Sequence, residues 1–439
     1  MSKKIQFLMV AIALASPTSQ AVPQEIFSDL IENSQHEIQA FLYNFNKATK
    51  DADVDDRRLQ SLVTIETGTS AELGEYTYFE ADLLTYLHSM EDSHDSLFHP
   101  FERNNSYAGF ITPKILKATY EQDEYDVAYG IDIVDFGYAE LHNSVSNFGR
   151  VNSIQPLHTK QLGVPLVRYQ KYVEDDTLSY TIMPIDTQSV GPIKSNRWRG
   201  TGSGVYPTLP NGTSVVDINT EPRSISTSEI KHLVLYEAVR SGFDYYLFGA
   251  AGPSGFSIVR LEGSTYEMHQ PTAFQVGAGV DTVFGQYKMY ADLMYQQTKN
   301  DEDQDFFRGT FGGLFKNSDW PKKIGLNEFR LTAEYARDVQ VDDQADRADL
   351  IYSSSPSRTG KNTFLGRVEL EVDDDLLLFS GFTYNQTNSD HSELFGARSK
   401  ISDSLEFYFV STFFDGKEFT ELGTQRNNDV VELGLRWTF

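Results

Sequence analysis

Serine, histidine and asparagine side chains lie close together between residues 142 and 147. The group consists of His142, Ser144, Ser146 and Asn147. A serine beside a histidine can attack an ester, but the reaction requires the two side chains about 3 Å apart and a third group that orients the base. Proximity in the sequence does not supply that geometry, and the nearby Gly149 is typical of a loop. We therefore expect no catalytic residue here and a protein that is not an enzyme.

Patterns that bind metals or cofactors are absent from the sequence. The nine histidines are scattered, and no two of them stand three or four residues apart. Asp301, Asp303 and Asp305 alternate as in a calcium loop, but the glycine and the closing glutamate of such a loop are missing. No phosphate-binding loop or dinucleotide fingerprint is present. We expect neither a metal nor a cofactor.

The chain is strongly acidic, with a formal net charge of -26 and a pI near 4.7. This charge argues against a nucleic-acid partner, which requires a basic surface. The acidic residues gather in short runs at 51–56, 301–305, 342–349 and 373–375. Solvated loops explain these runs, and bridging through divalent cations to lipopolysaccharide is the alternative.

Alternation of apolar and polar residues predicts β-strands, and these strands would position the charged side chains. The last strand is the clearest case, because one face is apolar and the other carries Glu432 and Arg436. The apolar face holds Val431, Leu433, Leu435, Trp437 and Phe439. One face of such a strand suits lipid and the other suits water.

The same alternation recurs along the whole chain and predicts an all-β fold. We expect a transmembrane antiparallel up-and-down β-barrel of about 18 strands, with 16 also acceptable, because bacterial barrels have an even number. The mean hydropathy of -0.40 excludes a helical membrane protein. The other expected strands lie near residues 37–45, 59–66, 76–86, 111–120, 125–134, 166–172, 177–183, 230–239, 243–248, 256–261, 273–281, 287–296, 306–315, 328–335, 364–372, 377–383, 393–400 and 405–414.

The N-terminus predicts export. Lys3 and Lys4 precede an apolar run and a small-residue cleavage site, so residues 1–21 are expected to be a signal peptide. Residues 22–439 should form a single outer-membrane β-barrel domain, with a short periplasmic helix within 25–39. Two long loops, 135–165 and 185–229, interrupt the strand rhythm, and loops of that length usually carry function. The absence of cysteine excludes disulfides and a lipid-modified N-terminal cysteine.

The terminal Trp437-Thr438-Phe439 resembles the signal by which the barrel-assembly machinery recognises outer-membrane barrels of Gram-negative bacteria. A weaker resemblance, to alginate-export-like porins, rests on residues 130–137 and on the strand pair around Tyr172 and Thr177-Leu178. The resemblance implies a location in the cell outer membrane, contact with its lipid and lipopolysaccharide, and termini in the periplasm. It leaves open whether the barrel is a monomer or an oligomer.

The polar faces of the expected strands predict what surrounds the bore. The residues expected to line the pore are Lys288, Asp292, Arg308, Glu328, Arg330, Glu334, Arg367, Glu369, Glu371, Glu432 and Arg436. Charges of both signs around a bore sort solutes by charge. A porin-like channel for passive diffusion of small hydrophilic solutes is the favoured function. The alternatives are a non-conducting barrel that binds partners or serves as a scaffold through its long loops and, less favoured, an outer-membrane lipid hydrolase.

The tripeptide Arg197-Trp198-Arg199 stands out in the second long loop, because it places two guanidiniums beside an indole in an acidic chain. Folded inward, it would form a constriction loop that narrows the pore and favours anions. As part of an extracellular loop, it would instead pair with neighbouring acids or with lipopolysaccharide phosphates. The sequence does not distinguish a constriction loop from an extracellular loop.

Removal of Phe439, or its replacement by Asp, tests the assignment of the C-terminal strand as an assembly signal. The variant is expected to accumulate in the periplasm and to be degraded there, because the terminal aromatic residue is lost. Immunoblots of fractionated cells measure this. Normal levels in the outer membrane would show that the C-terminus was misread.

Overall fold

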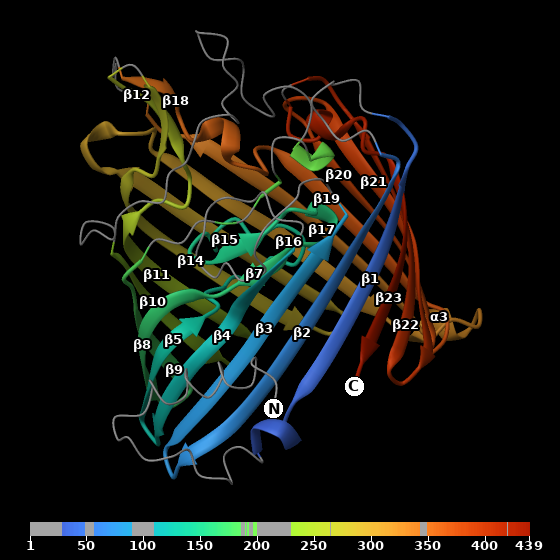
Figure 1. Cartoon of the computed structure of the whole chain (residues 1–439), viewed down its shortest axis with the longest axis horizontal. Coiled ribbons are helices and arrows are strands. Elements are labelled where there is room, and N and C mark those ends of the chain that lie inside the picture. Colours follow the sequence, from blue (N-terminus) through green and yellow to red (C-terminus); the bar gives the residue numbers. More distant parts are fainter. Residues whose placement is uncertain are drawn as a thin grey trace.

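Eighteen antiparallel strands form one sheet that closes on itself (Figure 1). The computed structural model describes residues 29–48, 57–89, 109–185, 189, 191–192, 196–199, 230–263, 265–342, 349–418 and 420–439. The spanning strands are β1 (Gln35–Phe45), β2 (Leu59–Gly74), β3 (Thr77–His88), β4 (Gly109–Gln122), β5 (Tyr125–Asp132), β8 (Val164–Val173), β9 (Asp176–Met183), β10 (Lys231–Arg240), β11 (Phe243–Pro253), β14 (Thr272–Phe284), β15 (Tyr287–Thr298), β16 (Phe306–Asn317), β17 (Glu328–Gln340), β19 (Thr363–Glu371), β20 (Leu376–Asn385), β21 (Asp390–Ser402), β22 (Leu405–Asp415) and β23 (Val430–Thr438). The predicted all-β barrel and its strand number are confirmed.

Pairing of the first and last strands closes the barrel. Each spanning strand pairs with the next one along the chain, and β1 also pairs with β23 in a register that sets Leu42 opposite Leu433. The closed sheet has no free edge, so every strand has a hydrogen-bonding neighbour on both sides.

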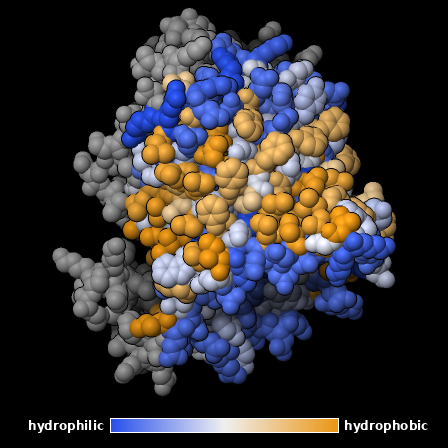
Figure 2. Space-filling view, turned by 90° about the vertical axis from the view of Figure 1, so that its right-hand side faces the viewer, coloured by the Kyte–Doolittle hydropathy of each residue, from blue (hydrophilic) through white to orange (hydrophobic). Residues whose placement is uncertain are grey.

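An apolar band surrounds the outer wall. Figure 2 shows hydrophobic side chains gathered in this band, with hydrophilic residues above and below it. Outward-facing Met289, Phe307 and Phe382 are each more than half exposed. An aromatic girdle follows one border of the band, where Tyr287 and Phe315 lie with ring centroids 5.0 Å apart. This layering matches the hydrocarbon core and the interface of a membrane.

The two ends of the barrel differ. The start of β1 and the end of β23 lie at one end, here called the turn end, where most connections between strands are short (Figure 1). The opposite loop end carries long connections. One of them contains β12 (Ile258–Glu262) and β13 (Thr265–His269), which form a separate three-stranded sheet with β18 (Leu350–Tyr352).

The expectation of a spanning strand at residues 256–261 is therefore wrong. β12 has five residues and pairs only with β13 and β18. A strand needs about nine residues to cross a bilayer, and β12 is too short.

The other sequence expectations concern the N-terminus and helices. The described part of the expected helix at 25–39 is helical only at 29–32, and β1 begins at Gln35. Residues 1–21, the expected signal peptide, lie outside the described residues. Within the described ranges, the helices are all too short or too polar to cross a membrane.

Candidate functional site

Strand alternation turns the predicted charged positions toward the bore. On β15, Lys288 and Asp292 alternate with Met289 and Leu293, whose side chains are exposed on the outer wall. The same parity holds on β16, β17, β19 and β23, so all eleven predicted pore-lining residues occupy inward positions. Whether each one reaches water depends on what else enters the barrel.

The connection between β5 and β8, residues 133–163, enters the bore and is here called the crossing loop. It contains β6 (Arg150–Asn152), the turn η1 (Pro156–His158) and β7 (Lys160–Leu162). Asp292 on β15 holds its first part, because the carboxylate accepts hydrogen bonds from the Tyr138 amide at 2.9 Å and the Ala139 amide at 2.7 Å. The Tyr246 hydroxyl donates to the same carboxylate at 2.7 Å.

Glu334 on β17 holds the next residues of the crossing loop. Its carboxylate accepts hydrogen bonds from the amides of Glu140, Leu141 and His142 at 2.7, 2.8 and 2.8 Å. Tyr290 adds a hydroxyl donor at 2.7 Å. Bonds to a charged acceptor contribute about 1.5–3 kcal/mol each, so the two carboxylates fix the loop strongly.

The far part of the crossing loop is attached to another section of the wall. His158 contacts Glu432 of β23 at 2.7 Å, and Lys160 contacts Glu66 of β2 at 2.7 Å. The loop thus runs from β15–β17 to β23–β2. It leaves β19–β22 on one side and the longer arc from β3 to β14 on the other.

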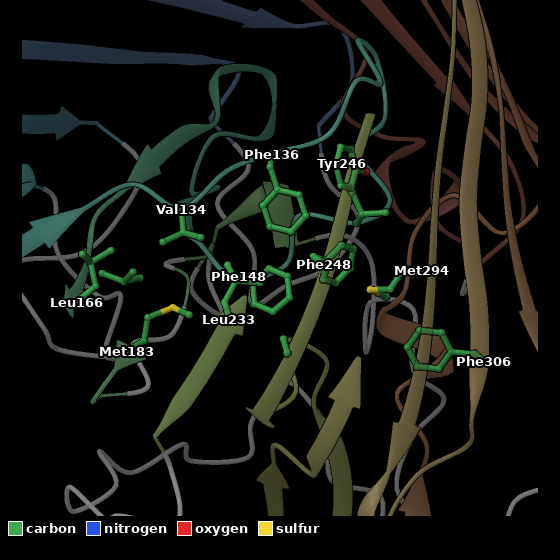
Figure 3. Close-up of a cluster of buried hydrophobic side chains, with 13 residues drawn as sticks. Val134, Phe136, Phe148, Leu166, Met183, Leu233, Tyr246, Phe248, Met294 and Phe306 are labelled. Atoms are coloured by element: carbon green, nitrogen blue, oxygen red, sulfur yellow. The ribbon is translucent and has the colours of Figure 1, made fainter. Parts of the chain in front are cut away.

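Apolar packing covers strands β8–β11 of the longer arc and the neighbouring β15 and β16. Phe136 and Phe148 of the crossing loop meet Phe248 of β11, with ring centroids 5.0 and 5.8 Å apart. Figure 3 shows these rings together with neighbouring inward side chains of the wall. The cluster also contains Val134, Val145, Val164, Leu166, Met183, Leu233, Tyr246, Ala250, Met294 and Phe306.

A second apolar cluster covers the wall from β23 to β4 toward the loop end. The crossing loop contributes Ile154 and Leu162, which pack against inward aromatic side chains of β1 and β3. The wall side chains of this cluster are Phe41, Tyr43, Phe45, Leu62, Leu84, Tyr86, Phe110 and Val430. Together the two clusters bury much of the inner wall on both sides of the crossing loop toward the loop end.

The β19–β22 side has a different lining. Its inward Phe379, Leu394 and Val410 are partly exposed and belong to neither cluster among the described residues. A cavity of about 320 Å³ lies along the same strands toward the turn end. Its lining residues are Arg330, Arg367, Glu369, Glu371, Asp373, Asp374, Asp375, Leu376, Leu377, Arg398, Lys400 and Glu406.

Ion pairs hold most of the cations of this cavity. Arg330 pairs with Glu328, and Arg367 pairs with Glu369 at 2.6 Å. Arg398 is exposed and has no ion pair or hydrogen bond within the described part of the chain. Its guanidinium is therefore available to a solute. The sequence reasoning missed Arg398, although the alternation of β21 could have identified it.

Burial separates the predicted pore-lining residues into two groups. Asp292, Arg308, Glu334 and Glu432 are at most 5 % exposed, because the crossing loop or neighbouring side chains cover them. The other seven, Lys288, Glu328, Arg330, Arg367, Glu369, Glu371 and Arg436, are partly exposed on the inner wall. The buried acids therefore act on the crossing loop rather than on a solute.

Arg197 and Trp198 lie at the loop end, in the turn η2 (Arg197–Arg199). The Arg197 guanidinium donates to the carbonyls of Lys47, Arg57 and Asn427, each at 3.0 Å. Trp198 is 2 % exposed and packs against Phe45. This position differs from the constriction envisaged from the sequence, because both side chains are buried in contacts at the loop end, where Trp198 also packs against Phe414 of β22. The Arg199 side chain and residues 200–229 lie outside the described residues.

The serine and histidine of the crossing loop have other partners. The Ser144 hydroxyl lies 2.5 Å from the Thr310 hydroxyl, and His142 lies against Gly360. Burial, together with the positive charge of Arg308, lowers the pKa of His142 to about 4, so the imidazole is neutral at pH 7. The described residues contain no cluster of three His, Cys, Asp or Glu side chains that could hold a metal.

Comparisons with known proteins bear on the fold. No family model matches the sequence, and no curated protein is similar to it in sequence. The fold is similar to that of Acinetobacter baumannii OccAB1, with a TM-score of 0.52 and 7% identity over 93% of this chain and 95% of that one. A BenF-like porin from Pseudomonas fluorescens Pf-5 gives 0.50 and 10% over 93% and 97%, and Pseudomonas aeruginosa OccD3 (OpdP) gives 0.50 and 9% over 93% and 90%. The chain therefore has the barrel fold of porins.

The double substitution Asp292→Asn and Glu334→Gln is expected to loosen the crossing loop. Each neutral side chain keeps one acceptor oxygen but loses its charge and turns an NH2 group toward backbone amides, so the contribution of a bond falls from about 1.5–3 kcal/mol to about 0.5–1.5 kcal/mol. Faster hydrogen exchange at residues 138–142, without loss of the folded barrel, is the expected measurement. Glu369→Gln is the control, because Glu369 faces the bore on β19 and pairs with Arg367 rather than with the loop. Unchanged exchange in the double variant would contradict the anchoring role.

Proposed function

We propose that the protein is an outer-membrane channel for passive diffusion of small hydrophilic solutes. The observation that carries the proposal is the division of the barrel interior by the crossing loop. Apolar clusters cover the longer arc toward the loop end and ion pairs such as Lys117–Asp132 lie below them, whereas the β19–β22 side has a charged cavity and partly exposed inward side chains. The solute path is assigned to this side.

The outer wall supports the location. An apolar band with an aromatic girdle fits the hydrocarbon core and interface of a bilayer, and the closed sheet satisfies its backbone groups within the wall. The proteins named above as porins share this fold, which agrees with a channel.

The inner wall supports selection by charge. Four cations and six carboxylates line the cavity, so a solute passes groups of both signs. Such a lining favours small hydrophilic solutes over apolar ones. A hydrophilic solute loses water when it enters, and the charged side chains replace that water as hydrogen-bonding partners.

Single-channel recording in planar bilayers tests the proposal. Stepwise conductance at constant voltage is expected from the purified full chain. A barrel that inserts but stays silent at every voltage would overturn the channel and favour a scaffold or surface-binding barrel. Liposome swelling with sugars, amino acids and organic acids of graded size then measures which solutes pass.

The substitution Arg398→Gln is expected to shift ion preference toward cations. A unit charge about 7 Å from a passing ion changes its energy by roughly 0.6 kcal/mol in water, which is about a threefold change in local ion concentration. The reversal potential in a gradient of dilute salt measures the shift. Arg337→Gln is the control, because Arg337 faces outward on β17 beside Tyr335. Equal reversal potentials for all three proteins would contradict the assigned path.

A further inference from the structure

The connection between β16 and β17 is the longest one at the turn end. It covers residues 318–327 and includes the short helix α3 (Asp319–Lys322), whereas the other connections at this end, all of them described, have two to four residues. Figure 1 shows α3 projecting sideways from the barrel wall. Joining two paired strands does not require this length, so the segment, here called the α3 turn, calls for another explanation.

The α3 turn continues the aromatic girdle of the outer wall. The Trp320 ring lies 5.4 Å from the Phe329 ring, and Phe329 lies 6.2 Å from Phe315. Trp320 remains 40% exposed and Ile324 66% exposed, while Pro321 is buried beneath them. An exposed indole beside an exposed aliphatic side chain fits the boundary between headgroups and acyl chains.

Two cations lie between these apolar side chains. Lys322 and Lys323 are both exposed, and neither has an ion pair in the described part of the chain. Asp319 is the single acid of the α3 turn, and the acids of the adjacent β19–β20 turn line the cavity inside the barrel. The α3 turn thus carries two lysines without a described ion pair on a segment that projects from the wall, in a chain of net charge -26.

We infer that the α3 turn binds the headgroups of anionic phospholipids in the membrane leaflet at the turn end. Lys322 and Lys323 contact the phosphate groups, while Trp320 and Ile324 enter the acyl boundary. Each lysine near an anionic surface contributes about a fivefold preference, so the pair is expected to give roughly a 30-fold preference at low salt. The inference rests on the membrane location proposed above and not on conduction.

Fluorescence quenching in vesicles tests the inference. The full chain is inserted into phosphatidylcholine vesicles that contain a minor fraction of either brominated phosphatidylglycerol or brominated phosphatidylcholine, in dilute salt. The signal of Trp320 is the difference between the wild type and Trp320→Phe, since the chain has two other tryptophans. Brominated phosphatidylglycerol is expected to quench this signal more strongly than the same fraction of brominated phosphatidylcholine.

Matched variants show whether the preference for the anionic lipid comes from Lys322 and Lys323 or from any lysine of the protein. The double substitution Lys322→Gln and Lys323→Gln should make the two lipids quench equally. Lys299→Gln at the loop end should leave the preference unchanged. If the two brominated lipids quench Trp320 equally in the inserted wild-type barrel, the lipid-binding inference is wrong, but the membrane location stands. Failure of the wild type to insert into any vesicle would overturn the membrane location and the inference together.

Discussion

Pairing of β1 with β23 is the constraint on which the rest of the structure depends. A strand in hydrocarbon has no water to satisfy its backbone, so a sheet is stable there only when its edges meet. Closure also creates an inside and an outside. The alternation of each strand then turns every second side chain toward lipid, where apolar residues are placed, and the others toward the bore, where the charged residues lie.

The crossing loop turns this symmetrical scaffold into an asymmetrical interior. The backbone of a loop that enters a barrel needs hydrogen-bond partners. Asp292 accepts hydrogen bonds from two main-chain amides of the loop, and Glu334 accepts them from three. The loop then supplies Phe136, Phe148 and Ile154 to inward apolar side chains that would otherwise face water. Carboxylate anchors and apolar packing thus act together to hold the loop against one part of the inner wall.

The inward face of β1 illustrates the limit of reading strands by alternation. Glu37 and Gln39 near the turn end are polar, but Phe41, Tyr43 and Phe45 near the loop end are apolar. A strand that becomes apolar on both faces signals that something packs inside the barrel. That signal is present in the sequence, but it does not identify the segment that packs there, and the constriction loop considered from the sequence lies in 185–229 rather than in the crossing loop.

The sequence by itself determined the barrel, a strand number near 18 and the inward parity of the charged residues, because alternation with a period of two is a local property of the chain. It also excluded a basic nucleic-acid surface through the net charge. Only the tertiary structure decided which inward residues meet water. Glu334 accepts a hydrogen bond from Glu140, 194 positions away, and Arg197 contacts Asn428 across 231 positions. Such contacts depend on where a long loop comes to rest, and no local pattern of residues encodes that position.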